Sequence, residues 1–288
     1  MNIKFSSSHK KQEPESGVLY IVGTPIGNLN DISSRAINIM KNVSLLACED
    51  TRQTKKIMSK FDFTNSLISF NKHNSLNKIP RLIKTLKSGK SIALVSDAGM
   101  PSICDPGEDL IKNAKSKSIK VICIPGPCAA LTALVSSGFT SSKFTFEGFF
   151  PKKSSERKKL LLEINQNEKT TILFESPYRL IKLLNDLKKY LGGEREIQVF
   201  RELTKKFEEH IGNNINEVIK YFEGQEVMGE ITVVIKGKNQ TKKNLEFDEI
   251  ELKKELDDLI NAGLTLSQAS KYLAKKNNLT KSVIYDMY

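Results

Sequence analysis

A repeated order of apolar strand, loop and amphipathic helix constrains the fold of this chain more than any other feature. Short apolar runs occur at 18–22, 43–47, 67–70, 92–95 and 121–124, and segments with helical periodicity separate them. Strands that alternate with helices form parallel sheets. The first half of the chain is therefore predicted to be an α/β domain on a largely parallel sheet.

Capping residues mark the expected starts of three helices in this half. Asp and Asn side chains accept hydrogen bonds from the free backbone N–H groups at a helix start, and proline suits the first helical position. The expected helices are 32–41 after Asp31, the segment from Asn74 to Lys87, and a helix opened by Asp105 and Pro106 that ends near Ser118.

After Gly138 the strand and helix pattern restarts, so we expect a second α/β domain to begin there. Its segments 196–203 and 207–211 are neighbours that are expected to pair antiparallel, which makes the second sheet mixed. The other expected strands are 144–149, 170–174 and 231–235, and the expected helices begin at Ser154 and span 178–191.

The ends of the chain differ from its two α/β domains, which are expected at 17–138 and 139–237. Residues 1–16 are polar, lack the apolar core of a signal peptide and are expected to be a flexible leader. Residues 245–288 are expected to form a small helical domain. Its turns resemble those of a helix-turn-helix unit that binds nucleic acid, but a cap of three packed helices explains them equally. The expected helices are 248–261, 266–276 and 281–288.

The composition of the chain indicates what kind of molecule it binds. Apolar residues make up 39% of the chain and charged residues 27%, as in an ordinary globular protein. The net charge of +12 (45 − 33) lies mainly in residues 1–138, which hold 19 Lys and Arg against 10 Asp and Glu. An excess concentrated on one domain favours a polyanionic partner such as RNA, although a lysine-rich composition alone is the simpler explanation.

The four cysteines and three histidines have no spacing typical of a metal site, so no metal is expected. Free thiols suit a reduced compartment, and no stretch approaches the ~20 apolar residues that cross a membrane. We therefore expect a cytoplasmic protein. The cysteines are Cys48, Cys104, Cys123 and Cys128.

Three loops rich in glycine and proline follow predicted strands, at 23–31, 96–107 and 125–130. Ligands of open α/β sheets bind beyond the carboxyl ends of the strands, where these loops are expected to meet. The first loop lacks GxGxxG spacing, and Lys84 occupies the place of the leading glycine in a Walker match at 88–91, so phosphate binding is not indicated. A zwitterionic ligand suits backbone groups and the single carboxylate of Asp97, although a lone Asp in such a loop is more often a turn cap.

The motifs of this chain, taken together, resemble the signature of the small-subunit ribosomal RNA methyltransferase I family. That family belongs to the tetrapyrrole methylase fold group, and the resemblance spans residues 17–237. The motifs are GTPIGNL at 23–29, EDTR at 49–52, SDAGMP at 96–101, DPG at 105–107, IPGP at 124–127, FFPK at 149–152, FESPYR at 174–179, RELTK at 201–205 with Glu208, and GE at 229–230.

The resemblance implies a homodimeric enzyme of the two-domain tetrapyrrole-methylase-like fold. It implies 2′-O-methylation, by S-adenosylmethionine, of a cytidine ribose in the decoding region of 16S rRNA, with the free RNA or the small ribosomal subunit as partner. It also implies cofactor contacts from Asp97, Ala98, Gly99, Ile103, Pro127, Ala129, Glu175, Ser176, Leu203, Glu230, Ile231 and Thr232.

A ribose hydroxyl is too weak an acid to ionise at neutral pH, so a carboxylate that accepts its proton would assist the reaction. Glu49, Asp50, Glu175 and Glu202 are the candidates, and the sequence does not choose among them. Arg52 is expected to bind a phosphate or to orient Asp50.

The RNA is expected to lie across a basic rim on the second domain. Basic runs are also common on solvated helix faces, and aromatic residues that could stack on an unpaired base could equally belong to the core. Besides Arg52, the expected RNA contacts are Lys152, Lys153, Arg157, Arg179, Arg201 and Lys205, and the aromatic candidates are Phe70, Phe149 and Tyr178.

Two other functions stay open. A corrin or porphyrinogen methylase would share the fold, but the net charge, the GTPIGNL loop and the helical tail argue against it. A non-catalytic RNA-binding assembly factor would keep the basic surface, yet it would not need three ligand loops.

Overall fold

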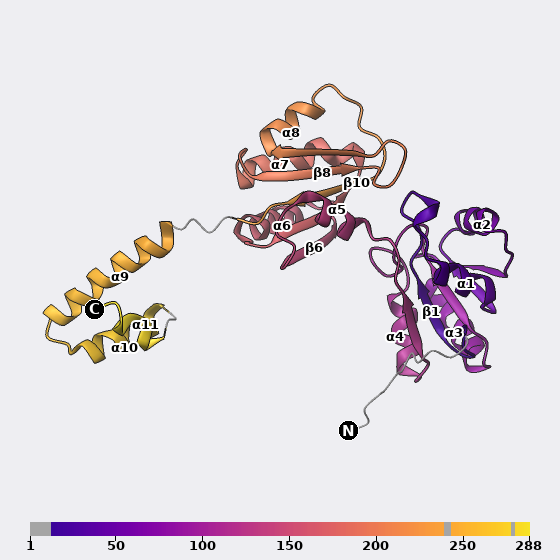
Figure 1. Ribbon diagram of the computed structural model, residues 1–288, viewed down its shortest axis with the longest axis horizontal. Helices are drawn as coiled ribbons and strands as arrows, with labels where there is room; N and C mark the ends of the chain where they lie inside the picture. Colours follow the sequence, from indigo (N-terminus) through magenta and orange to yellow (C-terminus); the bar gives the residue numbers. More distant parts are fainter. Residues whose placement is uncertain (1–12, 239–242, 278–279) are drawn as a thin grey trace. The chain divides into compact units, whose positions relative to one another are not determined.

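The structure, a computed structural model, describes residues 13–238, 243–277 and 280–288. It contains two compact units, Met1–Gly237 and Lys238–Tyr288 (Figure 1). Most of the expected leader lies outside the described residues. The described end of that segment is bound to the first domain, because Glu13 pairs with Arg35 and Glu15 pairs with Lys120.

The first sheet has five strands in the order β3-β2-β4-β1-β5, and every pair in it is parallel. This confirms the parallel sheet predicted from the alternating pattern. The strands are β1 (Leu19–Val22), β2 (Leu45–Cys48), β3 (Leu67–Ser69), β4 (Ile92–Val95) and β5 (Val121–Ile124).

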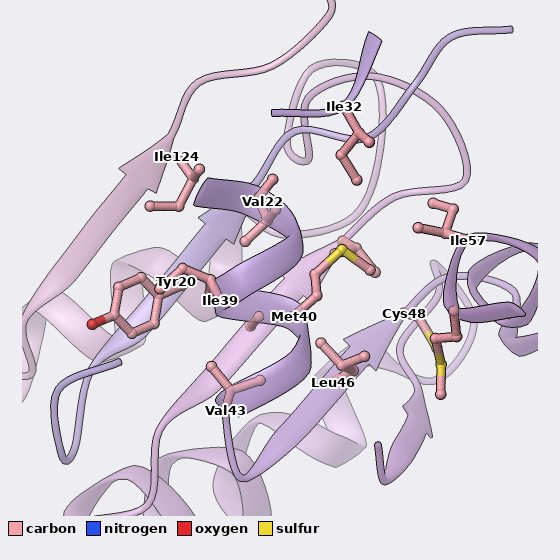
Figure 2. Packing of buried hydrophobic residues seen from close by; sticks show 14 of the residues in the cluster. Tyr20, Val22, Ile32, Ile39, Met40, Val43, Leu46, Cys48, Ile57 and Ile124 are labelled. Atoms are coloured by element: carbon pink, nitrogen blue, oxygen red, sulfur yellow. The ribbon is translucent and has the colours of Figure 1, made fainter. Parts of the chain in front are cut away.

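Helices cover both faces of this sheet because its strands are apolar on both sides. On one face, α1 (Ser34–Asn42) and α2 (Thr51–Lys60) pack Ile39, Met40 and Ile57 against Tyr20 and Leu46 (Figure 2). On the other face, α3 (Ser75–Lys87) and α4 (Glu108–Ser116) form a second cluster, and both clusters are almost fully excluded from solvent. The carboxyl edge of the sheet is thus fixed from both sides.

Two helix starts differ from those expected. The side chain that caps α1 is Ser33, which accepts a hydrogen bond from the Ala36 backbone, whereas Asp31 lies in the short 3-10 turn η1 (Leu29–Asp31). The helix expected from Asp105 begins only at Glu108, after Gly107. Pro106 is therefore not its first helical residue, because the loop continues past it.

The second sheet has the order β6-β7-β10-β8-β9, with β6 and β7 parallel and the remaining pairs antiparallel. The predicted mixed sheet is confirmed. Helices α6, α7 and α8 pack on one face of it. The elements are β6 (Phe144–Phe149), α6 (Ser154–Gln166), β7 (Thr170–Glu175), η2 (Pro177–Arg179), α7 (Leu180–Leu191), β8 (Glu196–Arg201), β9 (Glu209–Asn214), α8 (Ile215–Phe222) and β10 (Ile231–Ile235).

The other face of the second sheet is covered by α5 (Ala129–Ser137), which follows the last strand of the first sheet. Ala130, Ala133 and Leu134 pack against Ile172 and Val234. The two sheets are thereby joined through a shared core, so the loops at the carboxyl edge of the first sheet lie against the second domain.

The C-terminal unit is helical, as predicted. It comprises α9 (Lys243–Asn261), α10 (Leu266–Asn277) and α11 (Lys281–Tyr285). Leu256, Leu273 and Ile284 form its buried core. Among the residues that the structure describes, no helix is long and apolar enough to span a membrane.

Candidate functional site

The three glycine-proline loops meet at the carboxyl edge of the first sheet. Gly23 and Gly126 lie backbone against backbone, because a Cβ built on Gly126 would stand only 2.7 Å from the Gly23 Cα. Thr24 and Gly99 form an antiparallel bridge, in which the Thr24 N–H donates to the Gly99 carbonyl at 2.9 Å. Glycine is needed at these points because any side chain would separate the loops.

The second domain contacts the first of these loops. The Asn28 N–H donates to the Thr204 hydroxyl at 3.1 Å, and a Cβ on Gly27 would clash with the Lys205 side chain. Both residues of the second domain belong to the turn after β8. The GTPIGNL loop therefore connects the two domains and also forms one side of the site.

A cavity of about 430 Å³, which we call the main cavity, lies between the loops and the second domain. This volume lies within the range of about 300–1,000 Å³ typical of small-molecule sites. Its lining is Ile26, Glu49, Asp97, Ala98, Gly99, Met100, Ile103, Cys104, Asp105, Cys128, Ala129, Phe149, Phe174, Glu175, Ser176, Pro177, Gly229, Glu230, Ile231 and Thr232.

All but two of the expected cofactor contacts line this cavity. The exceptions are Pro127, whose carbonyl lies beside Gly99, and Leu203, which is buried in the core shared with α5. Sequence reasoning missed eight lining residues. Five lie inside loops it had identified, Ile26, Met100, Cys104, Asp105 and Cys128, and three belong to the second domain, Phe174, Pro177 and Gly229. The motifs therefore located the cofactor site correctly along the chain, but the sequence did not indicate which residues of each loop line the cavity.

Three carboxylates from the first domain line the main cavity. Burial raises the pKa of Glu49, Asp97 and Asp105 above their ordinary values, and the negative charges of their neighbours add to the effect. For Asp105 the pKa rises to about 6. The positive charge of Lys72 opposes the shift at Glu49 and Asp105, so a lysine lies near the group.

Two short-range contacts fix Glu49 and Asp97 relative to one another. The Asp97 carboxylate accepts a hydrogen bond from the Asp50 backbone at 2.9 Å, and the Glu49 carboxylate accepts one from the Asp97 backbone. The loops after β2 and β4 are thereby tied together, as expected for neighbouring parallel strands.

Glu175 is the most deeply buried acidic side chain of the cavity, with no exposed surface. Its Oε1 atom accepts a hydrogen bond from the Ser176 backbone at 2.6 Å and pairs with Arg179. Its Oε2 atom has no hydrogen-bond partner among the described residues. A buried acceptor without a partner is costly, so a donor on a bound ligand would relieve that cost.

The other two candidate bases, Asp50 and Glu202, do not line the main cavity. Asp50 is held by the Arg52 guanidinium, which lowers the pKa of its carboxyl to about 2, and it also caps α2. Glu202 accepts hydrogen bonds from Lys205 and the Glu230 backbone, both at 2.8 Å, and these contacts lower its pKa. Both carboxylates are therefore occupied by hydrogen bonds and ion pairs that stabilise the local structure.

A second pocket, the β2–β3 pocket, adjoins the main cavity and has a volume of about 450 Å³. Glu49 lines both spaces. The pocket lies at the carboxyl ends of two neighbouring strands, β2 and β3. Its lining is Glu49, Asp50, Thr51, Arg52, Ser69, Asn71, Lys72 and His73.

The expected RNA contacts are in different environments. Lys152 and Lys153 are exposed, whereas the Arg157 side chain is only 8% exposed, pairs with Asp186 and lies over the Phe150 ring. Arg157 therefore belongs to the core of the second domain and not to a basic rim. Arg179, Arg201 and Lys205 are each held by a carboxylate, from Glu175, Glu209 and Glu202 respectively.

The aromatic candidates also differ in their exposure to solvent. Phe70 is buried in the core of the first domain, so it cannot stack on a base. Tyr178 is 92% exposed, and Phe149 is 58% exposed while it lines the main cavity. Only the latter two offer a free ring face beside the site.

Replacing Asp105 by Asn is expected to stabilise the fold above pH 6. The folded pKa lies above the ordinary value of 3.8, so the folded state binds the proton more tightly. Wild type therefore loses stability as the pH rises from about 4, and the loss is complete above about 6. After allowance for solvent screening, we expect the variant to be more stable than wild type by about 1–2 kcal/mol at pH 8. The difference should vanish only at about pH 3 and below, beneath the ordinary pKa of 3.8, where both folded and unfolded wild type carry the proton.

Chemical denaturation at pH 3, 6 and 8 measures this effect. Glu147→Gln removes an exposed carboxylate of β6 and should change stability little at any pH. An Asp105→Asn variant that is less stable than wild type at pH 8 would mean that the carboxylate is stabilised by contacts rather than strained by burial.

Residues 18–219 match the model of the tetrapyrrole (corrin/porphyrin) methylases. The chain is 42% identical to the ribosomal RNA small subunit methyltransferase I of Synechocystis sp., over 94% of this chain and 97% of that protein. It is 40% identical to the protein of the same name from Bacillus subtilis, over 95% of this chain and 94% of the relative.

Solved structures support the fold. A cobalt precorrin-4 methyltransferase matches with a TM-score of 0.59 and 13% identity, over 76% of this chain and 95% of that one. The uroporphyrin-III C-methyl transferase of Thermus thermophilus, complexed with S-adenyl homocysteine, matches with a TM-score of 0.55 and 12% identity, over 75% and 96%. At these identities the likeness concerns the fold alone.

Proposed function

Because the chain belongs to the tetrapyrrole methylase family and to its ribosomal RNA small subunit methyltransferase I group, we propose that it transfers a methyl group from S-adenosylmethionine to ribosomal RNA. The acceptor is the 2′-hydroxyl of a cytidine in the decoding region of 16S rRNA. The observation that carries this proposal is the main cavity, whose lining combines the glycine-proline loops with a buried, partly unsatisfied carboxylate.

The lining fits the cofactor in volume and in chemistry. S-adenosylmethionine has an amino group and ribose hydroxyls that donate hydrogen bonds, and a cationic sulfonium. Asp97 and the free Oε2 atom of Glu175 would accept such donors, and the backbone around Ala98, Gly99 and Thr232 would hold the adenosine. The apolar side chains of Ile26, Ile103 and Phe174 would exclude water.

When bound, S-adenosylmethionine supplies a methyl carbon that is electrophilic because it is attached to a positively charged sulfur. The residues that line the two spaces would hold the ribose hydroxyl in position to attack that carbon, and such positioning can supply much of the acceleration. The hydroxyl oxygen forms the new bond to carbon, the carbon–sulfur electron pair stays on sulfur, and the hydroxyl proton passes to a carboxylate.

Glu49 is that carboxylate in our proposal. It lines both the main cavity and the β2–β3 pocket, so it faces the junction at which a cofactor and a nucleotide would meet. Its raised pKa makes it a better proton acceptor than an ordinary glutamate. Asp50 and Glu202 are poorer candidates, because their cationic partners lower their pKa values.

RNA binding is supported by the net charge of +12 and by exposed residues near the site. Lys152, Lys153 and Arg52 are exposed cations, and Phe149 and Tyr178 offer aromatic faces on which an unpaired base could stack. A cytoplasmic location is part of the proposal because the substrate is ribosomal RNA. A homodimer is also proposed, and the exposed apolar residues Leu131 and Val135 of α5 offer a surface for it.

The proposal is tested by methyl transfer from labelled S-adenosylmethionine to small ribosomal subunits from cells that lack this gene, followed by nuclease mapping. We expect label on a single cytidine ribose. Asp97→Ala removes a cavity carboxylate and its hydrogen bond to the Asp50 backbone, so we expect the affinity for S-adenosylmethionine, measured by calorimetry, to fall at least tenfold.

Lys143→Ala, an exposed substitution outside the main cavity, is the control and should leave the affinity for the cofactor unchanged. Cofactor binding without any label on RNA would contradict the proposed substrate and favour a tetrapyrrole. No cofactor binding at all would favour a non-catalytic RNA-binding protein.

A further inference from the structure

The β2–β3 pocket is a built cavity that the cofactor does not explain. It opens beside the main cavity, shares Glu49 with it and has a volume of about 450 Å³. Its other lining residues are polar, and three of them, Arg52, Lys72 and His73, are exposed and able to donate hydrogen bonds to an anion. A pocket of this composition suits a sugar-phosphate better than an apolar ring.

The turn that carries Lys72, between β3 and α3, is held in place by hydrogen bonds among its own residues. The Asn71 side chain accepts from the His73 backbone at 3.1 Å, and the Asn74 side chain accepts from the Asn71 backbone at 3.0 Å. Lys78 anchors the same turn through the Ser69 carbonyl at 2.6 Å. The turn between β3 and α3 is therefore rigid before any ligand arrives, which lowers the cost of binding.

Lys72 differs from Arg52, the other permanent cation that lines this pocket, because no described carboxylate holds it. Arg52 is already bound to Asp50 through three hydrogen bonds, from 2.6 to 3.0 Å. Lys72, in contrast, has no hydrogen bond or ion pair with any residue that the structure describes, although its charge acts on Glu49 and Asp105. A ligand phosphate would give this ammonium group a partner.

We propose that the β2–β3 pocket binds the sugar-phosphate of the RNA nucleotide to be methylated, and that Lys72 holds a phosphate next to its ribose. This inference rests on the proposed function. It places the ribose hydroxyl beside Glu49, the residue shared by the two spaces, while the base remains free to contact Phe149 or Tyr178. Lys72 is thus a positioning residue that acts on the substrate and not on the reacting atoms.

The test compares Lys72→Ala with wild type, in complex with S-adenosylhomocysteine, for binding to small ribosomal subunits from cells that lack this gene. Loss of one charge-assisted phosphate contact should weaken binding about tenfold at low salt. The slope of log affinity against log salt should fall by about 0.7, the value for one phosphate of a single strand. In methyl transfer, KM for the subunit should rise more than kcat falls, and Lys72→Arg should restore binding.

Lys84→Ala is the matched control, because it removes an equal charge from the opposite end of α3 and lies outside both cavities. If Lys72→Ala changes the affinity and salt slope no more than Lys84→Ala does, the pocket does not hold a phosphate and the inference is wrong. If wild type transfers methyl groups to no RNA, the proposed function fails first, and the two failures are thereby distinguished. Unaltered binding of S-adenosylhomocysteine by calorimetry verifies that both variants fold.

Discussion

Replacing Glu49 by Gln is expected to lower the rate of methyl transfer by about a hundredfold to ten-thousandfold, the usual contribution of a positioned proton acceptor. Glutamine has the same shape and can still accept the hydrogen bond from the Asp97 backbone, so the loops should keep their arrangement. It cannot accept the ribose proton. Single-turnover rates with saturating cofactor and subunits measure the effect, and the affinity for S-adenosylmethionine should change little.

The pH profile supplies a second readout of the same residue. Burial and the charge of Asp97 raise the pKa of Glu49, so the wild-type rate should fall with decreasing pH at a pKa above that of an ordinary glutamate. This acidic limb should be absent from Glu49→Gln. Asp50→Asn is the matched comparison, because asparagine can still cap α2. A larger loss of rate in Asp50→Asn than in Glu49→Gln would transfer the role to Asp50.

Glu49 and Asp50 illustrate what the sequence could not decide about the site. The two carboxylates are adjacent, follow the same strand and have the same chemistry, so pattern alone offers no choice between them. The structure separates them because α2 begins immediately afterwards: its first turn draws Asp50 into a cap, while Glu49 faces the cavity. Sequence reasoning expected a helical segment between these strands but gave no bounds or cap for it, since the first residues of α2 belong to a motif that was interpreted for its chemistry.

Much of the fold could be predicted because its strands are short apolar runs between turn residues. The limits of β4 and β10 agree with the prediction, and both strands are fully buried. Local charge was less informative, as Arg157 demonstrates. It lies in a basic run, yet its position on the buried face of α6 brings it to Asp186 and Phe150. Such pairings join residues far apart in sequence, which periodicity cannot detect.

The close approach of the loops after β1 and β5 also joins residues far apart in sequence, so periodicity could not detect it. A substitution at this contact is expected to have a large effect. Replacing Gly126 by Ala should lower the free energy of unfolding by about 2–3 kcal/mol, since overpacking of this kind cannot be relieved by a rotamer change. A Cβ at Gly126 meets the Gly23 Cα, C and O atoms at 2.7–2.9 Å, and all of these are backbone atoms. One of the two loops must therefore move away from the main cavity, and we also expect the affinity for S-adenosylmethionine to fall at least tenfold.

Gly212→Ala is the control for this argument, because the three atoms nearest to its new Cβ all belong to the end of the Gln198 side chain, on the neighbouring strand β8. That side chain can rotate, and Gly212 lies on the edge strand β9, so the expected loss of stability is below about 1 kcal/mol, with cofactor binding unchanged. Chemical denaturation and calorimetry on the two variants measure both effects. If Gly126→Ala costs no more than Gly212→Ala, the loops tolerate separation. The cofactor site would then not depend on the contact between Gly23 and Gly126, and the loops would be held by their other contacts, among them the Thr24–Gly99 bridge and the hydrogen bond from the Asp50 backbone to Asp97.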